Sequence, residues 1–132
     1  MTSRGLLDTS IFVARESGRA LERSLVPDEA FVCVVTIAEL EAGVLAAPDT
    51  ATRHRRLATF QAASRLVPLP VDAGAASQWA VLRVHLRQAG RRMGVNDLWI
   101  ASVALAQGLP VVTQDEDFDV LDELGLLHVI KI

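Results

Sequence analysis

Four acidic side chains stand where a parallel α/β sheet would gather functional groups. Asp8 and Asp115 each follow a short apolar run, and Glu39 and Asp97 fall in the first turn of an expected helix. Strand carboxyl ends and helix amino ends meet at one edge of such a sheet, so the four carboxylates are expected to converge. Clustered carboxylates must be protonated or hold a cation, and Mg²⁺ prefers oxygen ligands. The pattern indicates a divalent-metal site of the kind that supports phosphodiester cleavage.

Each acid taken singly also has an ordinary structural interpretation. Glu39 follows Thr36 by three residues, which is the spacing of a capping box at a helix start. Asp97 and Asp115 could serve as helix N-caps, each worth about 1 kcal/mol. The chain has a single lysine, Lys131, to neutralise four converging acids. Their combination therefore favours the metal-site interpretation.

Hydrophobic patterning predicts the elements that must position these acids. Apolar strands are expected at 4–8, 31–35, 66–69, 111–113 and 127–130, and helices at 9–13, 19–25, 36–45, 50–65, 73–89, 98–106 and from 119 to 124. Strands that alternate with helices imply parallel pairing through right-handed crossovers. The expected fold class is α/β, a three-layer sandwich with a parallel central sheet of about five strands and helices on both faces.

Length and composition are those of one globular domain. The 132 residues, 51% of them hydrophobic, suffice for a buried core and predict a single domain over 1–132. The one cysteine, Cys33, lies in an apolar run, excludes an internal disulfide and suits a reducing compartment. No signal peptide is recognisable, and no apolar run approaches the roughly 20 residues of a membrane span. A cytoplasmic location without membrane contact is expected.

Basic residues are distributed unevenly along the chain. The net charge of −3 alone argues against a nucleic-acid partner, but six of the sixteen acids fall between positions 115 and 123. Arg83, Arg87 and Arg91 recur every fourth residue and form a stripe on one helix face. RNA phosphates could lie along that stripe. A solvated helix face is the alternative.

Four segments carry a resemblance to a known family. They are LLDTSIFVA at 6–14, VVTIAELEAGVL at 34–45, VNDLWIASVALAQGLPVVTQDEDF at 95–118, and a terminal strand ending near Ile130. Each segment alone is a weak signal, but four in this order and spacing are a strong one. The chain resembles PIN-domain proteins and, more narrowly, the VapC-type toxins of bacterial toxin–antitoxin pairs.

The resemblance implies a Mg²⁺- or Mn²⁺-dependent endoribonuclease, a hydrolase of RNA phosphodiester bonds. The family's catalytic acids fall on Asp8, Glu39, Asp97 and Asp115. Metal would be held by Asp8, Asp97 and Asp115, with Glu39 as a further ligand or as the group that positions water. Asp117 competes with Asp115 for the last ligand place, and Asp115 is favoured because Thr113 and Asp115 would point the same way from an extended strand. The secondary site residues are Thr9, Ser10, Thr113 and Asp117.

The resemblance also implies partners. A VapB-type antitoxin would block the acidic pocket, and the toxin would be a homodimer, with a heterotetramer or larger complex when the antitoxin is bound. RNA is the substrate, and transfer RNA is the first candidate. The rival interpretation is a catalytically inactive PIN-like module that binds RNA or protein. A receiver-like domain with Asp8 as phosphate acceptor is disfavoured, since such sites need a lysine beside the phosphate.

Overall fold

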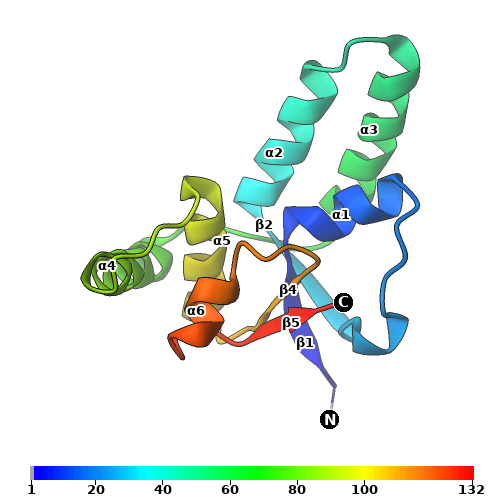
Figure 1. The fold of residues 1–132 in the computed structure, drawn as a ribbon. Coiled ribbons are helices and arrows are strands. Elements are labelled where there is room, and N and C mark those ends of the chain that lie inside the picture. The colour runs from blue at the N-terminus through cyan, green and yellow to red at the C-terminus, as the bar shows by residue number, and fades with distance from the viewer. Residues whose placement is uncertain (1) are drawn as a thin grey trace.

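A five-stranded, fully parallel sheet forms the middle layer of the structure, a computed structural model that describes residues 2–132 (Figure 1). The spatial order of the strands is β3-β2-β1-β4-β5, which puts β1 at the centre of the sheet. The number of strands and their parallel sense agree with the sequence prediction. The strands are β1 (Arg4–Leu7), β2 (Glu29–Cys33), β3 (Pro68–Leu69), β4 (Val111–Thr113) and β5 (Val129–Lys131).

Helices cover both faces of the sheet (Figure 1). They are α1 (Thr9–Glu16), α2 (Val34–Leu45), α3 (Thr50–Ser64), α4 (Ala73–Gln88), α5 (Val95–Ala106) and α6 (Asp119–Glu123), with a 3₁₀ turn, η1, at Arg23–Leu25. In Figure 1, α2 and α3 form a hairpin that rises above the sheet, and α4 and α5 lie together on the other side. Within residues 2–132, no helix is both long and apolar enough to cross a bilayer.

Alternation along the strands divides the core into two clusters. Leu6 and Val111 face the cluster formed with α4, α5 and α6, whereas Leu7 and Val112 face the cluster formed with α1, α2 and α3. All four side chains are at most 4% exposed. Successive strand side chains point to opposite faces, so a sheet covered on both sides needs consecutive apolar residues. This requirement explains the unbroken apolar runs in the sequence.

The predicted helix over 19–25 is wrong. Gly18, at φ +74°, ends α1, and the chain then follows an irregular path with only the short η1 turn. The segment contains helix-forming residues, but none of the η1 residues is buried. A helix without an apolar face packed on the core gains little stability in water.

The second strand and the helix after it are both displaced from their predicted limits. The strand occupies Glu29–Cys33 instead of 31–35, and α2 begins at Val34 instead of Thr36. The Cys33 Sγ accepts a hydrogen bond from the Val35 backbone N–H at 3.4 Å. Thr36 is therefore inside the helix and fully buried, which excludes the capping-box interpretation of Glu39.

Candidate active site

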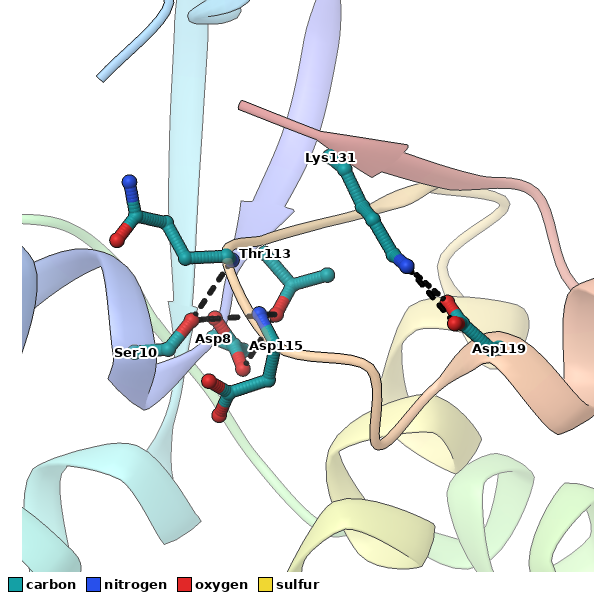
Figure 2. A network of polar contacts seen from close by, with 7 residues as sticks. Asp8, Ser10, Thr113, Asp115, Asp119 and Lys131 are labelled. Carbon is teal, nitrogen blue, oxygen red and sulfur yellow. Dashed lines mark hydrogen bonds and ion pairs between the residues drawn. The ribbon is translucent and has the colours of Figure 1, made fainter. Parts of the chain in front are cut away.

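Asp8 and Asp115 lie between β1 and β4, where the order in which the chain adds strands to the sheet reverses. From β1 the chain adds β2 and β3 on one side, whereas β4 and β5 lie on the other side of β1. Ligands of open parallel sheets bind beyond the strand carboxyl ends at such a switch point. Asp8 directly follows β1, and Asp115 comes two residues after the end of β4. Figure 2 shows the two carboxylates together at this edge.

Two hydroxyl groups hold the Asp8 carboxylate. Ser10 Oγ donates to Asp8 Oδ1 at 2.6 Å, and Thr113 Oγ1 donates to Asp8 Oδ2 at 3.0 Å. Ser10 Oγ in turn accepts from the Gln114 backbone N–H at 2.9 Å, and Thr113 Oγ1 accepts from the Asp115 backbone N–H at 3.0 Å (Figure 2). The two hydroxyl oxygens also lie 3.1 Å from each other, so Ser10, Thr113 and Asp8 form one network that orients the carboxylate.

Burial and neighbouring charges make Asp8 a weak acid for its type. The side chain is only 2% exposed. Desolvation raises its pKa from 3.8 to about 7, against the lowering effect of the bonds from Ser10 and Thr113. The charges of Asp115 and Asp97 contribute to the same rise in pKa. A group of this kind binds a proton or a cation at neutral pH.

The other acids of the cluster also affect one another. Burial raises the pKa of Asp97 from 3.8 to about 6, with added effects from Asp117, Glu39 and Asp115, in that order. Burial and the charge of Asp117 raise the pKa of Asp115, which the nearby Arg19 lowers in part. The carboxylates predicted from the sequence, together with Asp117, therefore lie within electrostatic reach of one another.

No lysine neutralises the acid cluster. Lys131 lies away from it, where its Nζ contacts both carboxylate oxygens of Asp119 at 2.8 Å (Figure 2). None of the ion pairs within residues 2–132 includes an acid of the cluster. These pairs are Arg4–Glu29, Arg91–Glu123 and Lys131–Asp119.

Glu39 joins the cluster from α2. Thr9 Oγ1 donates to Glu39 Oε1 at 2.7 Å, and Asn96 Nδ2 contacts Glu39 Oε2 at 3.4 Å. The two consecutive hydroxyl residues after Asp8 thus donate hydrogen bonds to different acids. Thr9 donates to Glu39, and Ser10 donates to Asp8. Sequence reasoning missed Asn96. Its only signal was its position directly before Asp97 at a helix start.

Neither Asp97 nor Asp115 is a helix cap. Gly94 is the N-cap of α5, so Asp97 lies in the first turn, and Phe118 is the N-cap of α6. A Cβ built on Gly94 would lie 3.3 Å from Asp97 Oδ2. The glycine therefore leaves room for the carboxylate.

The competing acid, Asp117, lies before the first turn of α6 and does not cap that helix. It precedes α6 in a turn and is exposed, whereas Asp115 is half-buried. Asp117 is therefore outside that helix. Its charge raises the pKa of Asp97 and of Asp115, whereas the charge of Asp115 raises the pKa of Asp8 and of Asp97.

The donor set fits a hard divalent cation. The clustered ligands are all carboxylate and hydroxyl oxygens, which suit Mg²⁺ or Mn²⁺ better than a soft metal. Among the described residues, no three carboxylate, imidazole or thiol groups already form a ready ligand set for a metal. The acids lie near enough to repel one another, and small side-chain rotations would be needed for them to share an ion.

Arg83 and Arg87 of the arginine stripe lie on an exposed face of α4. The prediction is wrong for Arg91, which lies in the loop after the helix ends at Gln88. Arg83, Arg87 and Arg91 line a groove of about 670 Å³ that also borders Leu98 of α5, the residue after Asp97. Arg91 Nη1 is paired with Glu123 Oε2 at 3.0 Å. Within residues 2–132, Arg83 and Arg87 form no ion pair, so their charges are not neutralised by an acid of the described chain.

The two tryptophans, Trp79 and Trp99, stack on each other between α4 and α5. Their ring centroids are 5.2 Å apart. Both rings are partly buried, so their role is to join the two helices.

Comparison with known proteins identifies relatives along nearly the whole chain. A family model described as the PIN domain matches residues 5–124. The chain is 52% identical over 128 residues to Ribonuclease VapC5 of Mycobacterium tuberculosis, covering 97% of this chain and 95% of that protein. It is 38% identical to Ribonuclease VapC4 of the same organism, covering 96% and 97%.

Solved structures give the same result. The structure of VapBC-5 from Mycobacterium tuberculosis, described as a member of the VapBC family of toxin–antitoxin systems, aligns with a TM-score of 0.91 and 48% identity, covering 98% of this chain and 99% of that chain. DNA-bound VapBC from Salmonella typhimurium aligns with a TM-score of 0.80 and 25% identity, covering 99% and 98%.

Proposed function

Since the chain belongs to the PIN-domain family, as an endoribonuclease of the VapC type from a toxin–antitoxin system, we propose that it hydrolyses RNA with Mg²⁺ or Mn²⁺ held by its clustered acids. The observation that carries this proposal is the convergence on Asp8. This buried carboxylate has a pKa raised to about 7, lies in the field of Asp97 and Asp115, and has no lysine to neutralise it. A divalent cation offsets that repulsion.

Three acids hold the cation in this proposal. Asp8, at the end of β1, is the central ligand, and Asp97 and Asp115 approach it from α5 and from the end of β4. When bound, the cation supplies Lewis-acid polarisation of the scissile phosphodiester and eases deprotonation of water. Ser10 and Thr113 orient the Asp8 carboxylate for this task through their short hydrogen bonds.

Glu39 positions the attacking water. Thr9 and Asn96 contact its two carboxylate oxygens, so the side chain is fixed beside Asp97 with further acceptor capacity on each oxygen. A carboxylate held in this way can accept a proton from water aligned with the scissile bond. Water attacks phosphorus directly as the P–O bond to the leaving ribose oxygen breaks, and that oxygen takes a proton from solvent. No covalent enzyme intermediate forms.

The substrate is RNA, and transfer RNA is the first candidate. We place the activity in the cytoplasm, where such RNA is found. Sequencing of RNA ends after brief induction in cells would identify the cleaved molecule and the position of the cut.

The activity is controlled by a VapB-type antitoxin. A small groove of about 290 Å³ lies beside the acids and is lined by Thr9, Val13, Glu39, Leu40 and Arg56, among others. An apolar segment of the antitoxin would lie along this groove between α1 and α2, and one of its arginines would pair with the acids. We propose that the toxin is a homodimer and that the complex is a heterotetramer or larger.

The decisive experiment compares the wild type with Asp8→Asn. Wild-type protein should cut RNA with Mg²⁺ or Mn²⁺ and stop on addition of a chelator. The variant should lose more than the roughly 10–100-fold that follows loss of a metal's outer-shell partner. It should also lose Mn²⁺ binding in a calorimetric titration while keeping its fold.

The matched control is Asp122→Asn, which removes an exposed carboxylate from α6. It should leave cleavage and metal binding unchanged.

Co-expression of the neighbouring small reading frame should relieve growth arrest by the wild type. A folded Asp8→Asn variant that cuts RNA at the wild-type rate would exclude the proposed metal site.

A further inference from the structure

A second basic groove is formed by the last turn of α1 and the irregular segment that follows it. Arg15, Arg19 and Arg23 line this groove, which has a volume of about 690 Å³. All three side chains are exposed, and within residues 2–132 none of them forms an ion pair. The groove therefore concentrates three unneutralised guanidinium groups in one place.

The backbone of this segment is fixed to the active site. At the end of α1, the Arg19 backbone N–H donates to the Ala14 carbonyl at 2.8 Å. The Gln114 side chain donates from Nε2 to the Ala20 carbonyl at 2.9 Å, and the Gln114 backbone N–H donates to Ser10 Oγ. One residue thus connects the wall of the groove to the hydroxyl that orients Asp8.

The groove lies on the Asp115 side of the acids. Arg19 is close enough to Asp115 to lower its pKa against the effects of burial and of Asp117. In Figure 1, the segment after α1 and the helix α4 lie on opposite sides of the molecule, with α1 and α5 between them. The groove and the arginine stripe of α4 are therefore two separate basic surfaces.

RNA needs positive charge close to this site. Five carboxylates whose charges act on one another repel a phosphate backbone, and charges interact over about 8 Å at physiological salt. Arginine offsets this repulsion well, because its planar guanidinium can donate two parallel hydrogen bonds to one phosphate. The groove provides three such groups, and one of them, Arg19, acts on Asp115 of the cluster.

We propose that the groove of Arg15, Arg19 and Arg23 is a phosphate-binding subsite for the RNA strand on the Asp115 side of the scissile bond. The inference rests on the proposed ribonuclease function. It requires the substrate to extend beyond the cut on that side by enough nucleotides to fill the groove. An acidic segment of a protein partner is the competing occupant.

The test separates binding from cleavage. In an Asp8→Asn background, RNA binding is measured with a labelled single-stranded oligonucleotide over a range of salt concentrations. Arg15→Ala with Arg23→Ala should weaken binding and reduce the slope of log K against log salt by about 1.4, since each single-strand phosphate contact contributes about 0.7. Arg19 is left intact because it acts on Asp115. In the cleavage-competent background, the loss should fall on KM and not on kcat.

The control is Arg53→Ala with Arg55→Ala on α3, which removes the same charge from exposed positions. It should leave the salt slope unchanged. An unchanged slope for the Arg15 and Arg23 double variant, in a protein whose wild type cuts RNA, would overturn the subsite. Loss of antitoxin binding with unchanged RNA affinity would assign the groove to the protein partner. If the wild type cuts no RNA, the proposed function fails, but the binding measurement still reports on the groove.

Discussion

At the residue scale, Asp115 and Asp117 have different electrostatic roles. Asp115 raises the pKa of the buried Asp8 and also acts on Asp97, whereas Asp117 is the strongest charge acting on Asp97. Asp115 is half-buried beside the switch point of the sheet, and Asp117 is exposed in the following turn. A cation shared with Asp8 should therefore bind Asp115 in preference to Asp117.

We expect Asp115→Ala to weaken Mn²⁺ binding and RNA cleavage by roughly tenfold or more, and Asp117→Ala to have a smaller effect. Calorimetric titration and initial rates of cleavage would measure both effects. Both variants remove one negative charge, so each serves as the other's control for net charge. A larger loss for Asp117→Ala would move the last ligand to the turn before α6.

Side-chain partners at the site were only partly predictable. The alternation rule placed Thr113 on the same side as Asp115, and Thr113 contacts both Asp8 and the Asp115 backbone. The sequence left Thr9 and Ser10 as alternatives for the hydroxyl residue near the site, because both stand at the start of the same helix. The rotation of α1 against α2 decides between them, and it depends on how the two helices pack together on one face of the sheet. The contact of Asn96 with Glu39 joins positions 57 residues apart and had no periodic signal.

At the scale of elements, the errors arise where tertiary contacts override local propensity. The segment 19–25 contains Arg, Ala, Leu and Glu, all of which favour helix. It stays irregular because Gly18 ends α1 and because Gln114 holds the Ala20 carbonyl from a neighbouring strand end. The long helix 73–89 was predicted nearly to its ends. Asp72 caps its start, with Oδ1 accepting from the Ala75 N–H at 2.9 Å.

The stripe on α4 gives a prediction at this scale. Arg83→Ala with Arg87→Ala should weaken RNA binding and reduce the salt slope by about 1.4, if both residues contact single-strand phosphates. Metal affinity should stay the same. Arg91→Ala should have a smaller effect, because Arg91 is paired with Glu123. Filter binding at several salt concentrations measures the slope, and a slope equal to that of the wild type would identify the stripe as a solvated helix face.

At the scale of the whole molecule, the layered fold could be predicted because the strand segments are continuously apolar. Strands of this kind are buried on both faces, so helices must cover both sides of the sheet. The parallel sense followed from the intervening helices. The order of neighbouring strands did not follow from patterning, since Leu6 and Leu7 of β1 pair with apolar residues of both β2 and β4. That order depends on which helices cover which face, and it places Asp8 beside Asp115.

The acid cluster should make the stability of the whole domain depend on pH. Asp8 has a pKa of about 7 when folded and 3.8 as the reference value for an unfolded chain. Between these values the folded state binds more protons, so the free energy of unfolding of metal-free protein should fall as pH rises from about 4 to about 7. Asp97, with a pKa raised to about 6, acts in the same direction.

We therefore expect Asp8→Asn to be more stable than the metal-free wild type at pH 8 by at least about 1 kcal/mol, or roughly 3–5 °C in melting temperature. Mg²⁺ should raise the melting temperature of the wild type at that pH and leave the variant unchanged. Thermal unfolding in a chelator, from pH 4 to 8, is the measurement. A wild-type stability that rises over this range would contradict the raised pKa of Asp8.

The interleaved order of the strands has a consequence for fragments of the chain. A cut in the turn between α2 and α3, at 46–49, would leave β1, β2, Asp8 and Glu39 in one piece and β3, β4, β5, Asp97 and Asp115 in the other. The strands of the second piece flank the β1–β2 pair on both sides, so neither piece can complete the sheet. Each half would be harmless by itself. Toxicity would require reassembly of the two pieces, which makes this turn the natural place to build a split reporter.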